Sequence, residues 1–321
     1  MEYLLCLQEL RSDALNTVLM AVTDFITSPV VYVGIALLYW CFNKRAASLI
    51  AMNISVGSMV NQALKNTFCI YRPWIRYPEI TPVPAAMDTA TGYSFPSGHT
   101  QLASGEFLSI AVWQKKRKWL VGVCIAITLL VMFTRNYLGV HTLEDVLVSL
   151  AVSLVVIFAG NNLSGWVDKG KNRDIAVLGV GMVLCAAFIV YVTIKPYPID
   201  YTQTGEVLVN PKDMINDCYS AAGCVVGFLI GRVAERHILN FRTDVSKSAK
   251  IMRGIVGTAL LLMLVLFAME PVTALHPYWG EFGFFVLAFI FILFIYPLMF
   301  VIWERVAYKK QHRPYKESIN M

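Results

Sequence analysis

The chain has few charged residues and no patterned cysteines. Only 15% of its 321 residues are Asp, Glu, Lys or Arg, against roughly 25% in an ordinary soluble domain. The seven cysteines are scattered, and four lie inside apolar runs, where a thiol is usually a small hydrophobe: Cys41, Cys124, Cys185 and Cys224. These shortages argue against a disordered chain, a nucleic-acid-binding protein and a disulfide scaffold.

Apolar residues, in contrast, are abundant. They make up 57% of the chain, and the mean hydropathy is +0.59. Apolar stretches long enough, or nearly so, to cross a bilayer recur along the sequence. We therefore predict an all-α, polytopic transmembrane helix bundle with about nine spans: 27–42, 46–64, 100–114, 119–134, 142–160, 175–194, 216–234, 254–270 and 281–303.

Two of these spans are weak. Pro29 interrupts the first span, and the amphipathic segment 15–26 before it is compatible with a position in the membrane interface. The third span is short and carries Glu106, so hydropathy alone would overlook it.

Basic residues gather on one side when the two sides of nine alternating spans are compared. Twenty of the 27 Lys and Arg lie there, in five groups: 44–45, 115–118, 169–173, 232–253 and 305–316. The positive-inside rule makes this side cytoplasmic. We therefore predict a multi-pass protein of the cell membrane with its amino terminus outside and its carboxyl terminus inside.

Seven basic residues remain on the outer side: Arg11, Lys65, Arg72, Arg76, Arg135, Lys195 and Lys212. Three of them belong to segments with other unusual residues. These segments are 65–73 at the end of the second span, 93–100 at the start of the third, and 134–145 between the fourth and fifth. The predicted topology brings all three segments to one membrane face.

The outer segments contain groups suited to a tetrahedral oxyanion. Lys65 offers a point charge, while Arg72 and Arg135 offer planar guanidinium forks. Ser97 and Gly98 lie where the third span begins, and free N–H groups at a helix amino terminus favour an anion. We predict a phosphate-binding site.

Two histidines supply a nucleophile and a proton donor. His141 and Asp145 are four residues apart at the start of a predicted helix, so the carboxylate can hold the imidazole and fix its tautomer. That makes His141 the better nucleophile. His99 has no carboxylate at such a spacing on its own helix and is the better general acid.

The three segments share an ordered pattern: Lys-x6-Arg-Pro, then Pro-Ser-Gly-His, then Arg-x5-His-x3-Asp. This pattern resembles the type 2 phosphatidic acid phosphatase superfamily over residues 65–145. The resemblance implies a phosphatase core with six spans in residues 1–194, followed by an extension with about three further spans in residues 195–321. One departure is Thr134, where the family commonly has Ser; a hydroxyl is retained.

The resemblance also implies a role for each matching residue. His141 attacks phosphorus and forms a phosphohistidine, Asp145 orients His141, and His99 protonates the leaving oxygen. Neither a metal nor another cofactor takes part. The implied phosphate-binding residues are Lys65, Arg72, Ser97, Gly98 and Arg135.

Three questions stay open at this point. His141 and Asp145 are also ordinary metal ligands, although the chain has only five histidines. Glu106 is either a packed, protonated acid facing the polar second span or a residue that supports the site. The aromatic and proline-rich segment 74–95 is either a lid or a set of interface anchors.

The sequence thus predicts a metal-independent, vanadate-sensitive hydrolase of a lipid phosphate, because acyl chains could stay in the bilayer while the head group reaches the cations. Candidate substrates are phosphatidate, a sphingoid-base phosphate, phosphatidylglycerol phosphate and an isoprenyl diphosphate. A soluble phosphate ester is an alternative substrate, and an anion transporter is the rival from another class. The expected partners are the bilayer and its lipids, without nucleic acid; the oligomeric state stays open.

Overall fold

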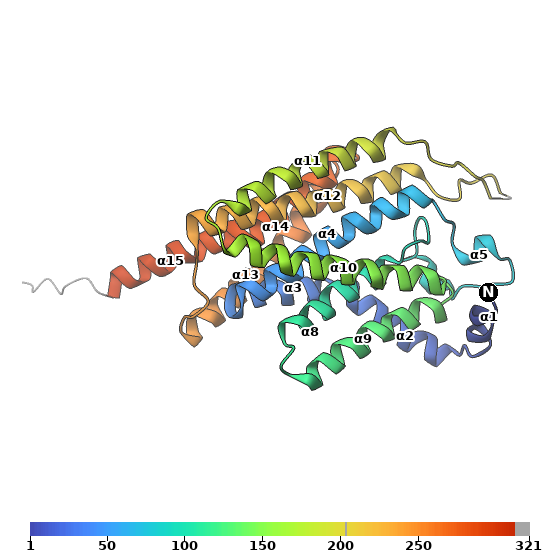
Figure 1. Ribbon diagram of the computed structural model, residues 1–321, viewed down its shortest axis with the longest axis horizontal. Coiled ribbons are helices and arrows are strands. Elements are labelled where there is room, and N and C mark those ends of the chain that lie inside the picture. Colours follow the sequence, from blue (N-terminus) through green and yellow to red (C-terminus); the bar gives the residue numbers. More distant parts are fainter. Residues whose placement is uncertain (203, 312–321) are drawn as a thin grey trace, which may run out of the picture.

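A computed structural model describes residues 1–202 and 204–311, with side chains as far as Val306 at the carboxyl-terminal end. Within these residues the chain is helical, without a strand beyond one isolated bridge between Tyr201 and Val207. Figure 1 shows the long helices side by side along one axis. The all-α prediction is therefore confirmed. Of the predicted basic groups, Arg313 and Lys316 lie outside the described residues.

Six long helical segments are apolar enough to cross a membrane, and each overlaps one of the predicted spans. Among the described residues these are α9 (Lys118–Tyr137), α10 (Leu143–Asp168), α11 (Arg173–Ile194), α12 (Pro211–Ala234) with the π-turn η3 (Glu235–Leu239), α13 (Lys247–Thr273), and α14 (Trp279–Ile290) with η4 (Phe291–Ile295) and α15 (Tyr296–Gln311). The chain is a multi-pass membrane protein.

The chain bends just before the first predicted span, 27–42. The helix α2 (Asp13–Thr27) ends at Ser28, and after a bend of 43° the span follows as α3 (Pro29–Leu37) and η1 (Leu38–Phe42), so Pro29 begins the span and does not interrupt it. Proline is favoured as the first residue of a helix but does not continue an existing one. Counting the bent pair as one span gives up to seven by length and composition among the described residues, so nine stays a prediction.

The helix α4 (Lys44–Phe68) lies at the centre of the bundle although it is polar. It packs against α10, α12, α7 (Gly98–Ala103) and α8 (Ser109–Trp113). Several of its polar side chains form hydrogen bonds inside the protein; for example, Asn53 Nδ2 donates to Ser109 Oγ at 2.5 Å. Because α4 is shielded from lipid on several sides, it does not need the apolar surface of a lipid-facing helix.

Glycines let the carboxyl-terminal helices approach closely. A Cβ at Gly223 of α12 would lie 2.5 Å from Phe282 O, and one at Gly227 would lie 2.7 Å from Val286 O. Small residues four apart allow two membrane helices to pack backbone against backbone. Through α12, the carboxyl-terminal helices are joined to α4, because α12 contacts both α14 and α4.

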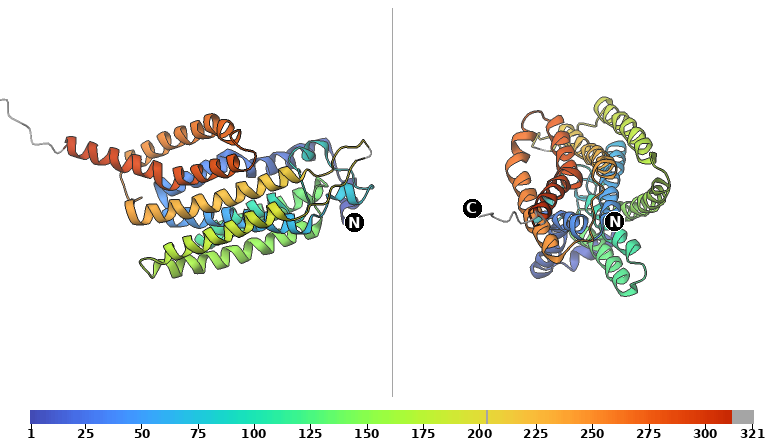
Figure 2. Two further views of the ribbon diagram at one scale, coloured as in Figure 1. Left: turned by 90° about the horizontal axis from the view of Figure 1, so that it is seen from above. Right: turned by 90° about the vertical axis from the view of Figure 1, so that its left-hand side faces the viewer.

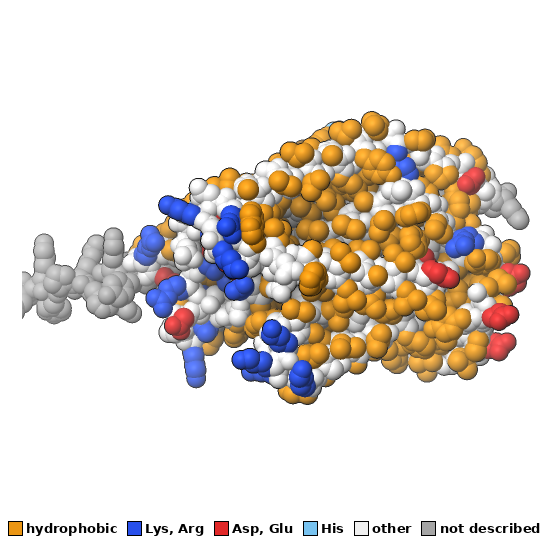
Figure 3. Space-filling view, viewed as in Figure 1, with side chains coloured by type: hydrophobic (Ala, Val, Ile, Leu, Met, Phe, Trp, Pro, Cys, Tyr) orange, Lys and Arg blue, Asp and Glu red, His pale blue; other side chains and the backbone are white. Residues whose placement is uncertain are grey.

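The two ends of the bundle differ in charge. Figure 3 shows a band of hydrophobic side chains along the middle, Lys and Arg clustered at one end, and Asp and Glu at the other. We call the first the basic end, with the loops 114–117 and 169–172. The opposite end, where α4 ends and α10 begins, is the site end. Figure 2 shows the amino terminus at the site end and α15 reaching past the basic end.

Candidate active site

The three predicted segments meet at the site end, held together by backbone hydrogen bonds. Ser94 N–H donates to Ile70 O at 2.7 Å, which joins the middle segment to the residues after α4. Ser97 N–H donates to Asp145 O at 3.1 Å, which joins the middle segment to α10. In the sequence, the short helices α5 (Pro73–Arg76) and α6 (Pro84–Met87) lie between Ile70 and Ser94.

His141 lies in the turn between α9 and α10 and is 1% exposed. Its Nδ1 lies 3.2 Å from Asp145 Oδ2, and its Nε2 lies 2.9 Å from Arg72 Nη1. A guanidinium only donates hydrogen bonds, so Nε2 is the acceptor and Nδ1 carries the proton that the carboxylate accepts. The lone pair of His141 is therefore on Nε2, directed away from Asp145.

Asp145 is held by its own helix start. Thr142 caps α10, and Asp145 completes a capping box, with Oδ2 accepting from Thr142 N–H at 2.8 Å. The hydroxyl of Ser94 also donates to Oδ2, at 2.5 Å, and Ser94 is fully buried. Sequence reasoning missed this role of Ser94, because only its place in the segment 93–100 hinted at it.

The guanidinium group of Arg72 donates hydrogen bonds to three backbone carbonyls. Its Nε donates to Gly92 O at 3.1 Å, Nη2 to Thr91 O at 2.7 Å, and Nη1 to Val140 O at 3.0 Å. It thereby fastens the residues before the Ser-Gly-His turn to those before His141. Burial lowers the pKa of Arg72 to about 10, so the guanidinium remains cationic at neutral pH.

Arg135 is fully buried and only partly satisfied. Its Nη1 donates to Thr23 Oγ1 of α2 at 3.1 Å. Its Nε and Nη2 have no hydrogen-bond partner among the described residues. Buried donors are nearly always paired, since a lone buried donor costs about 1–3 kcal/mol, more when charged. These two N–H groups are the donors that an oxyanion would accept from.

Ser97, Gly98 and His99 form the start of α7. Ser97 Oγ caps the helix by accepting from Thr100 N–H at 3.4 Å, and an added Cβ at Gly98 would meet no atom within 4 Å. The backbone at Gly98 is thus open to close approach. His99 is half-buried, and its Nε2 has no partner among the described residues. It lies within electrostatic range of Arg135 and of three other predicted site residues: His141, Arg72 and Lys65.

The local charges fix the protonation of His141. Burial, followed by the positive charges of Arg72, Arg135 and Lys65, holds the pKa of His141 well below its usual range. The imidazole is therefore neutral at neutral pH, as a nucleophile requires. Lys65, in the last turn of α4, is itself 6% exposed and extends the cationic group.

Other candidates lie outside this arrangement. Glu106 is 2% exposed inside the π-turn η2 (Ser104–Leu108), and neither of its carboxyl oxygens has a partner in the described part of the chain. Arg76 is exposed and donates to the hydroxyl of Tyr77 at 3.0 Å, as a rim charge would. Trp74, in the aromatic loop, packs against a cluster that includes Val83 and Tyr137. No group of three or more possible metal ligands was found among residues 1–202 and 204–311.

The sequence is similar to known families over most of the bundle. Residues 45–168 match the PAP2 superfamily, and residues 219–307 match the transmembrane extension of PAP2 superfamily phosphatases. An undecaprenyl-diphosphatase, BcrC of Bacillus subtilis (strain 168), is 31% identical over 150 residues, which cover 44% of this chain and 74% of the relative.

One solved structure has been matched as well. It is the crystal structure of a transmembrane PAP2-type phosphatidylglycerolphosphate phosphatase from Bacillus subtilis, with 23% identity and a TM-score of 0.42 over 53% of this chain and 85% of the other. The class follows from the sequence matches: a polytopic membrane phosphatase that hydrolyses phosphoric esters. The chain belongs to the PAP2 superfamily, that of the type 2 phosphatidic acid phosphatases, as the three motifs indicated.

Proposed function

We propose that the chain removes phosphate from a lipid phosphate at the extracytoplasmic face of the membrane, through a phosphohistidine on His141. Two observations at one site carry this proposal: a buried, neutral imidazole oriented by Asp145 at 3.2 Å, and the Arg135 Nε and Nη2, which have no partner among the described residues. A phosphate group supplies the oxygens for those donors and the phosphorus for Nε2.

In the first step, His141 Nε2 forms a bond to phosphorus while the bond from phosphorus to the leaving oxygen breaks. Arg72 Nη1 occupies Nε2 at 2.9 Å, so the phosphate must take this N–H as its own donor before attack. Negative charge builds on the equatorial oxygens in the transition state, where Lys65, Arg72 and Arg135 stabilise it. Ser97 and the open backbone at Gly98 complete the cradle.

His99 completes proton transfer in both steps. In the free protein, burial and then the charge of Arg135 hold the pKa of His99 well below its usual range. A bound phosphate dianion offsets that charge and favours the imidazolium, which gives its proton to the leaving oxygen. A water molecule then attacks the phosphohistidine, the bond between nitrogen and phosphorus breaks, and inorganic phosphate leaves. His99 takes the proton that the water releases, which restores the starting state.

A lipid substrate is favoured by location and by similarity. The site lies at one end of a bundle whose middle carries a hydrophobic band, so a head group could enter while its chains stay in the bilayer. The similarity to an undecaprenyl-diphosphatase favours an isoprenyl diphosphate among the candidates. In that reaction the leaving group is the lipid monophosphate. The basic loops at the other end support an extracytoplasmic site by the positive-inside rule.

Release of inorganic phosphate by the purified full chain, in detergent without added metal, tests the proposal. The panel contains an isoprenyl diphosphate, phosphatidylglycerol phosphate, phosphatidate, a sphingoid-base phosphate and a soluble phosphate ester. His141→Ala should lower kcat/KM by about four orders of magnitude, because it removes the nucleophile. Wild-type turnover by the folded variant would refute the phosphohistidine mechanism. Preference for the soluble ester would refute the lipid assignment alone.

A further inference from the structure

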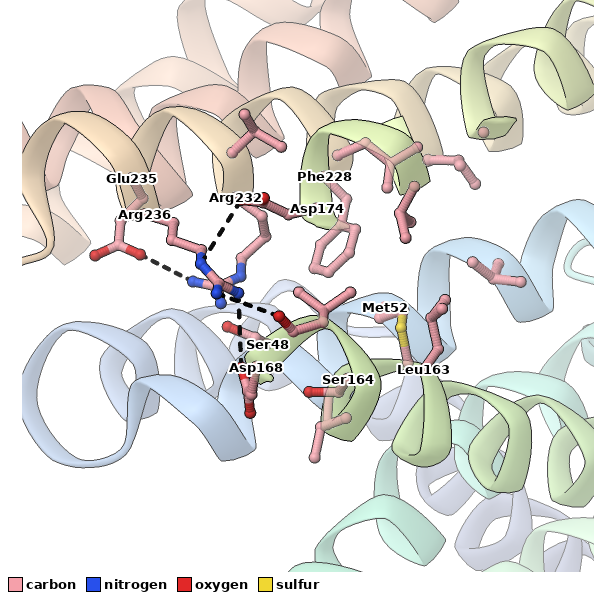
Figure 4. Close-up of a pocket in the computed structure, with 18 of the residues that line it drawn as sticks. Ser48, Met52, Leu163, Ser164, Asp168, Asp174, Phe228, Arg232, Glu235 and Arg236 are labelled. Atoms are coloured by element: carbon pink, nitrogen blue, oxygen red, sulfur yellow. Dashed lines mark hydrogen bonds and ion pairs between the residues drawn. The ribbon is translucent and has the colours of Figure 1, made fainter. Parts of the chain in front are cut away.

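A cavity lies at the basic end, opposite the candidate active site. It has a volume of about 710 Å³ and is lined by residues of α4, α10, α11, α12 and η3. Figure 4 shows Phe228, Met52 and Leu163 on its walls, and Arg232, Arg236, Asp168 and Glu235 grouped toward one side. A cavity in the range of about 300–1,000 Å³ is of the size that holds one small ligand.

One wall of this cavity is an apolar face of α11. On α11 the residues Ala176, Val180 and Leu184 line it at four-residue spacing, which places them on one helix face. Val180 is 61% exposed and Leu184 is 56% exposed, so this face has no helix packed over it. An apolar face of this kind in a membrane protein is suited to the acyl chain of a lipid. The charged residues at the mouth of the cavity then determine which head group that lipid carries.

The mouth of the cavity has more cations than anions. Lys44, Arg45, Arg232 and Arg236 face three carboxylates: Asp168, Asp174 and Glu235. Glu235 is tightly held, by Lys44 at 2.7 Å and by Arg232 at 2.9 Å. Arg236 is anchored through Nη2, which donates to the carbonyls of Val167 and Gly170 at 3.2 Å. Its ion pairs through Nη1 with Asp168 and through Nε with Asp174 are both 3.7 Å long, so Nη1 and Nε can donate to a ligand. One positive charge remains in excess.

Arg45 is the second cation available to a ligand. Its side chain is 66% exposed, and its ion pair with Asp168 spans 3.1 Å between two exposed groups. Exposed ion pairs contribute little to stability, about 0–1 kcal/mol. A phosphate group can therefore take Arg45 and Arg236 as donors without a large loss of protein contacts, and it would neutralise the excess charge.

We propose that this cavity binds one anionic phospholipid from the leaflet at the basic end, with an acyl chain between α4 and α11 and its phosphate on Arg45 and Arg236. Basic pockets between membrane helices on the cytoplasmic side are suited to anionic head groups. The acyl chain covers the face of α11 that no helix covers. Charge complementarity at the mouth selects an anionic over a zwitterionic lipid.

Binding of phosphatidylglycerol to the delipidated full chain in neutral detergent, measured by native mass spectrometry, tests the proposal. Phosphatidylglycerol is a phosphodiester and lacks the terminal phosphate that the proposed hydrolysis removes, so this test does not depend on the proposed function. One molecule should bind at least tenfold more tightly than phosphatidylcholine with the same chains. Equal affinities would overturn the proposal.

Variants separate the two parts of the site. The double variant Arg45→Gln, Arg236→Gln should lose at least tenfold in phosphatidylglycerol affinity. Its matched control, Arg117→Gln, Lys118→Gln, removes two exposed cations at the same end that do not line the cavity, and should bind normally. An equal loss in both variants would overturn the proposal, because it would indicate only general attraction of anionic lipid.

The exposed Val180 keeps the test decisive if Arg236→Gln impairs folding. Val180→Trp narrows the cavity and leaves every charge at its mouth, so it should weaken phosphatidylglycerol binding at least tenfold. Unchanged binding by this variant would overturn the proposal. Inorganic phosphate should displace little lipid; complete displacement at millimolar concentration would identify a site for the free ion instead and would also overturn it.

Discussion

Two buried arginines, one at each end of the bundle, are treated differently by the fold. At the basic end, Arg253 is 2% exposed, and both Nε and Nη2 donate to Glu304 at 2.8 Å, while Nη1 donates to Trp40 O and Arg242 O. At the site end, Arg135 is fully buried and has one side-chain partner, Thr23. Arg253 is satisfied by the protein, whereas Arg135 keeps Nε and Nη2 without partners among the described residues, so these donors are available to a ligand.

The two ends also differ in how their charged residues are arranged. His141 is surrounded by cations and one carboxylate; burial first, and then the positive charge of those cations, lower its pKa and keep it neutral. Ion pairs at the basic end, such as Lys44 with Glu235, instead bring opposite charges together. Like charges gathered in one place repel, and they persist at a site whose ligand carries the opposite charge.

The largest expected difference between the two ends comes from matched substitutions. Arg135→Gln should lower kcat/KM by about 10²–10³-fold with little change in Tm, because it removes donors that act in the transition state. Arg253→Gln should do the reverse: it leaves Glu304 without its partner and should cost about 3 kcal/mol of stability. Phosphate release and thermal unfolding of both variants measure the contrast. A stable, fully active Arg135→Gln would remove the distinction.

A smaller effect is expected for the carboxylate that orients His141. Ser94→Ala removes the hydroxyl that donates to Asp145 Oδ2 and should lower kcat about tenfold, by analogy with groups that orient a ligating or catalytic side chain. Ser149→Ala is the matched control. Ser149 is equally buried, but its hydroxyl donates to the carbonyls of Ser97 and Asp145. Equal kinetic losses in both variants would mean that Ser94 supports folding and not orientation.

The pH dependence tests the neutral state of His141. Its pKa is lowered, so the folded protein resists protonation at pH values where an ordinary imidazole, with a pKa of about 6.5, is protonated. Between pH 7 and pH 5.5, the contribution of His141 to the fall in kcat/KM should be less than about twofold, instead of about tenfold. As the pH is lowered, the imidazole of the unfolded chain is protonated before that of the folded protein, so the stability of the fold should decrease from pH 7 to pH 5.5. Measured kcat/KM and Tm profiles decide; an acid limb from His141 near pH 6.5 would contradict this.

The smallest effect is expected for Glu106, a buried acid that belongs to neither end. A neutral, protonated carboxyl group and a Gln amide have nearly the same shape, so Glu106→Gln should leave kcat/KM within about twofold of wild type and alter stability only slightly. Phosphate-release kinetics measure this. A tenfold loss of kcat with an unchanged Tm would instead assign Glu106 a role in supporting the site.

The long helices could be predicted from the sequence because helices that face lipid must be apolar. The stretch 175–194 became α11, Arg173–Ile194, and 119–134 became α9, Lys118–Tyr137. The ends extend beyond the apolar residues because helices continue into the polar boundary region. The π-turn at 104–108 was not foreseen, since the hydropathy of a stretch does not report which backbone hydrogen bonds its residues form.

The contacts of the site were harder to foresee than its members. Topology and motif spacing placed His141 beside Asp145, since residues four apart on a helix share a face. They did not reveal that the guanidinium of Arg72 donates hydrogen bonds to the carbonyls of Thr91, Gly92 and Val140. Such contacts depend on how two loops, about fifty to seventy residues apart in sequence, are arranged in space. The division at residue 194 remains a proposal.

The hydrogen bond between Arg135 and Thr23 shows that residues outside the matched family region contact the candidate site. The match begins at residue 45, but the helix α2, which bears Thr23, precedes it, and Arg11 reaches from the same region to the carbonyl of Tyr137 at 2.8 Å. On the other side, Cys218 of α12 accepts from Asn66 Nδ2 of α4 at 3.0 Å. A truncated protein limited to the matched residues 45–168 would therefore lose side chains that hold Arg135, Tyr137 and Asn66 in place.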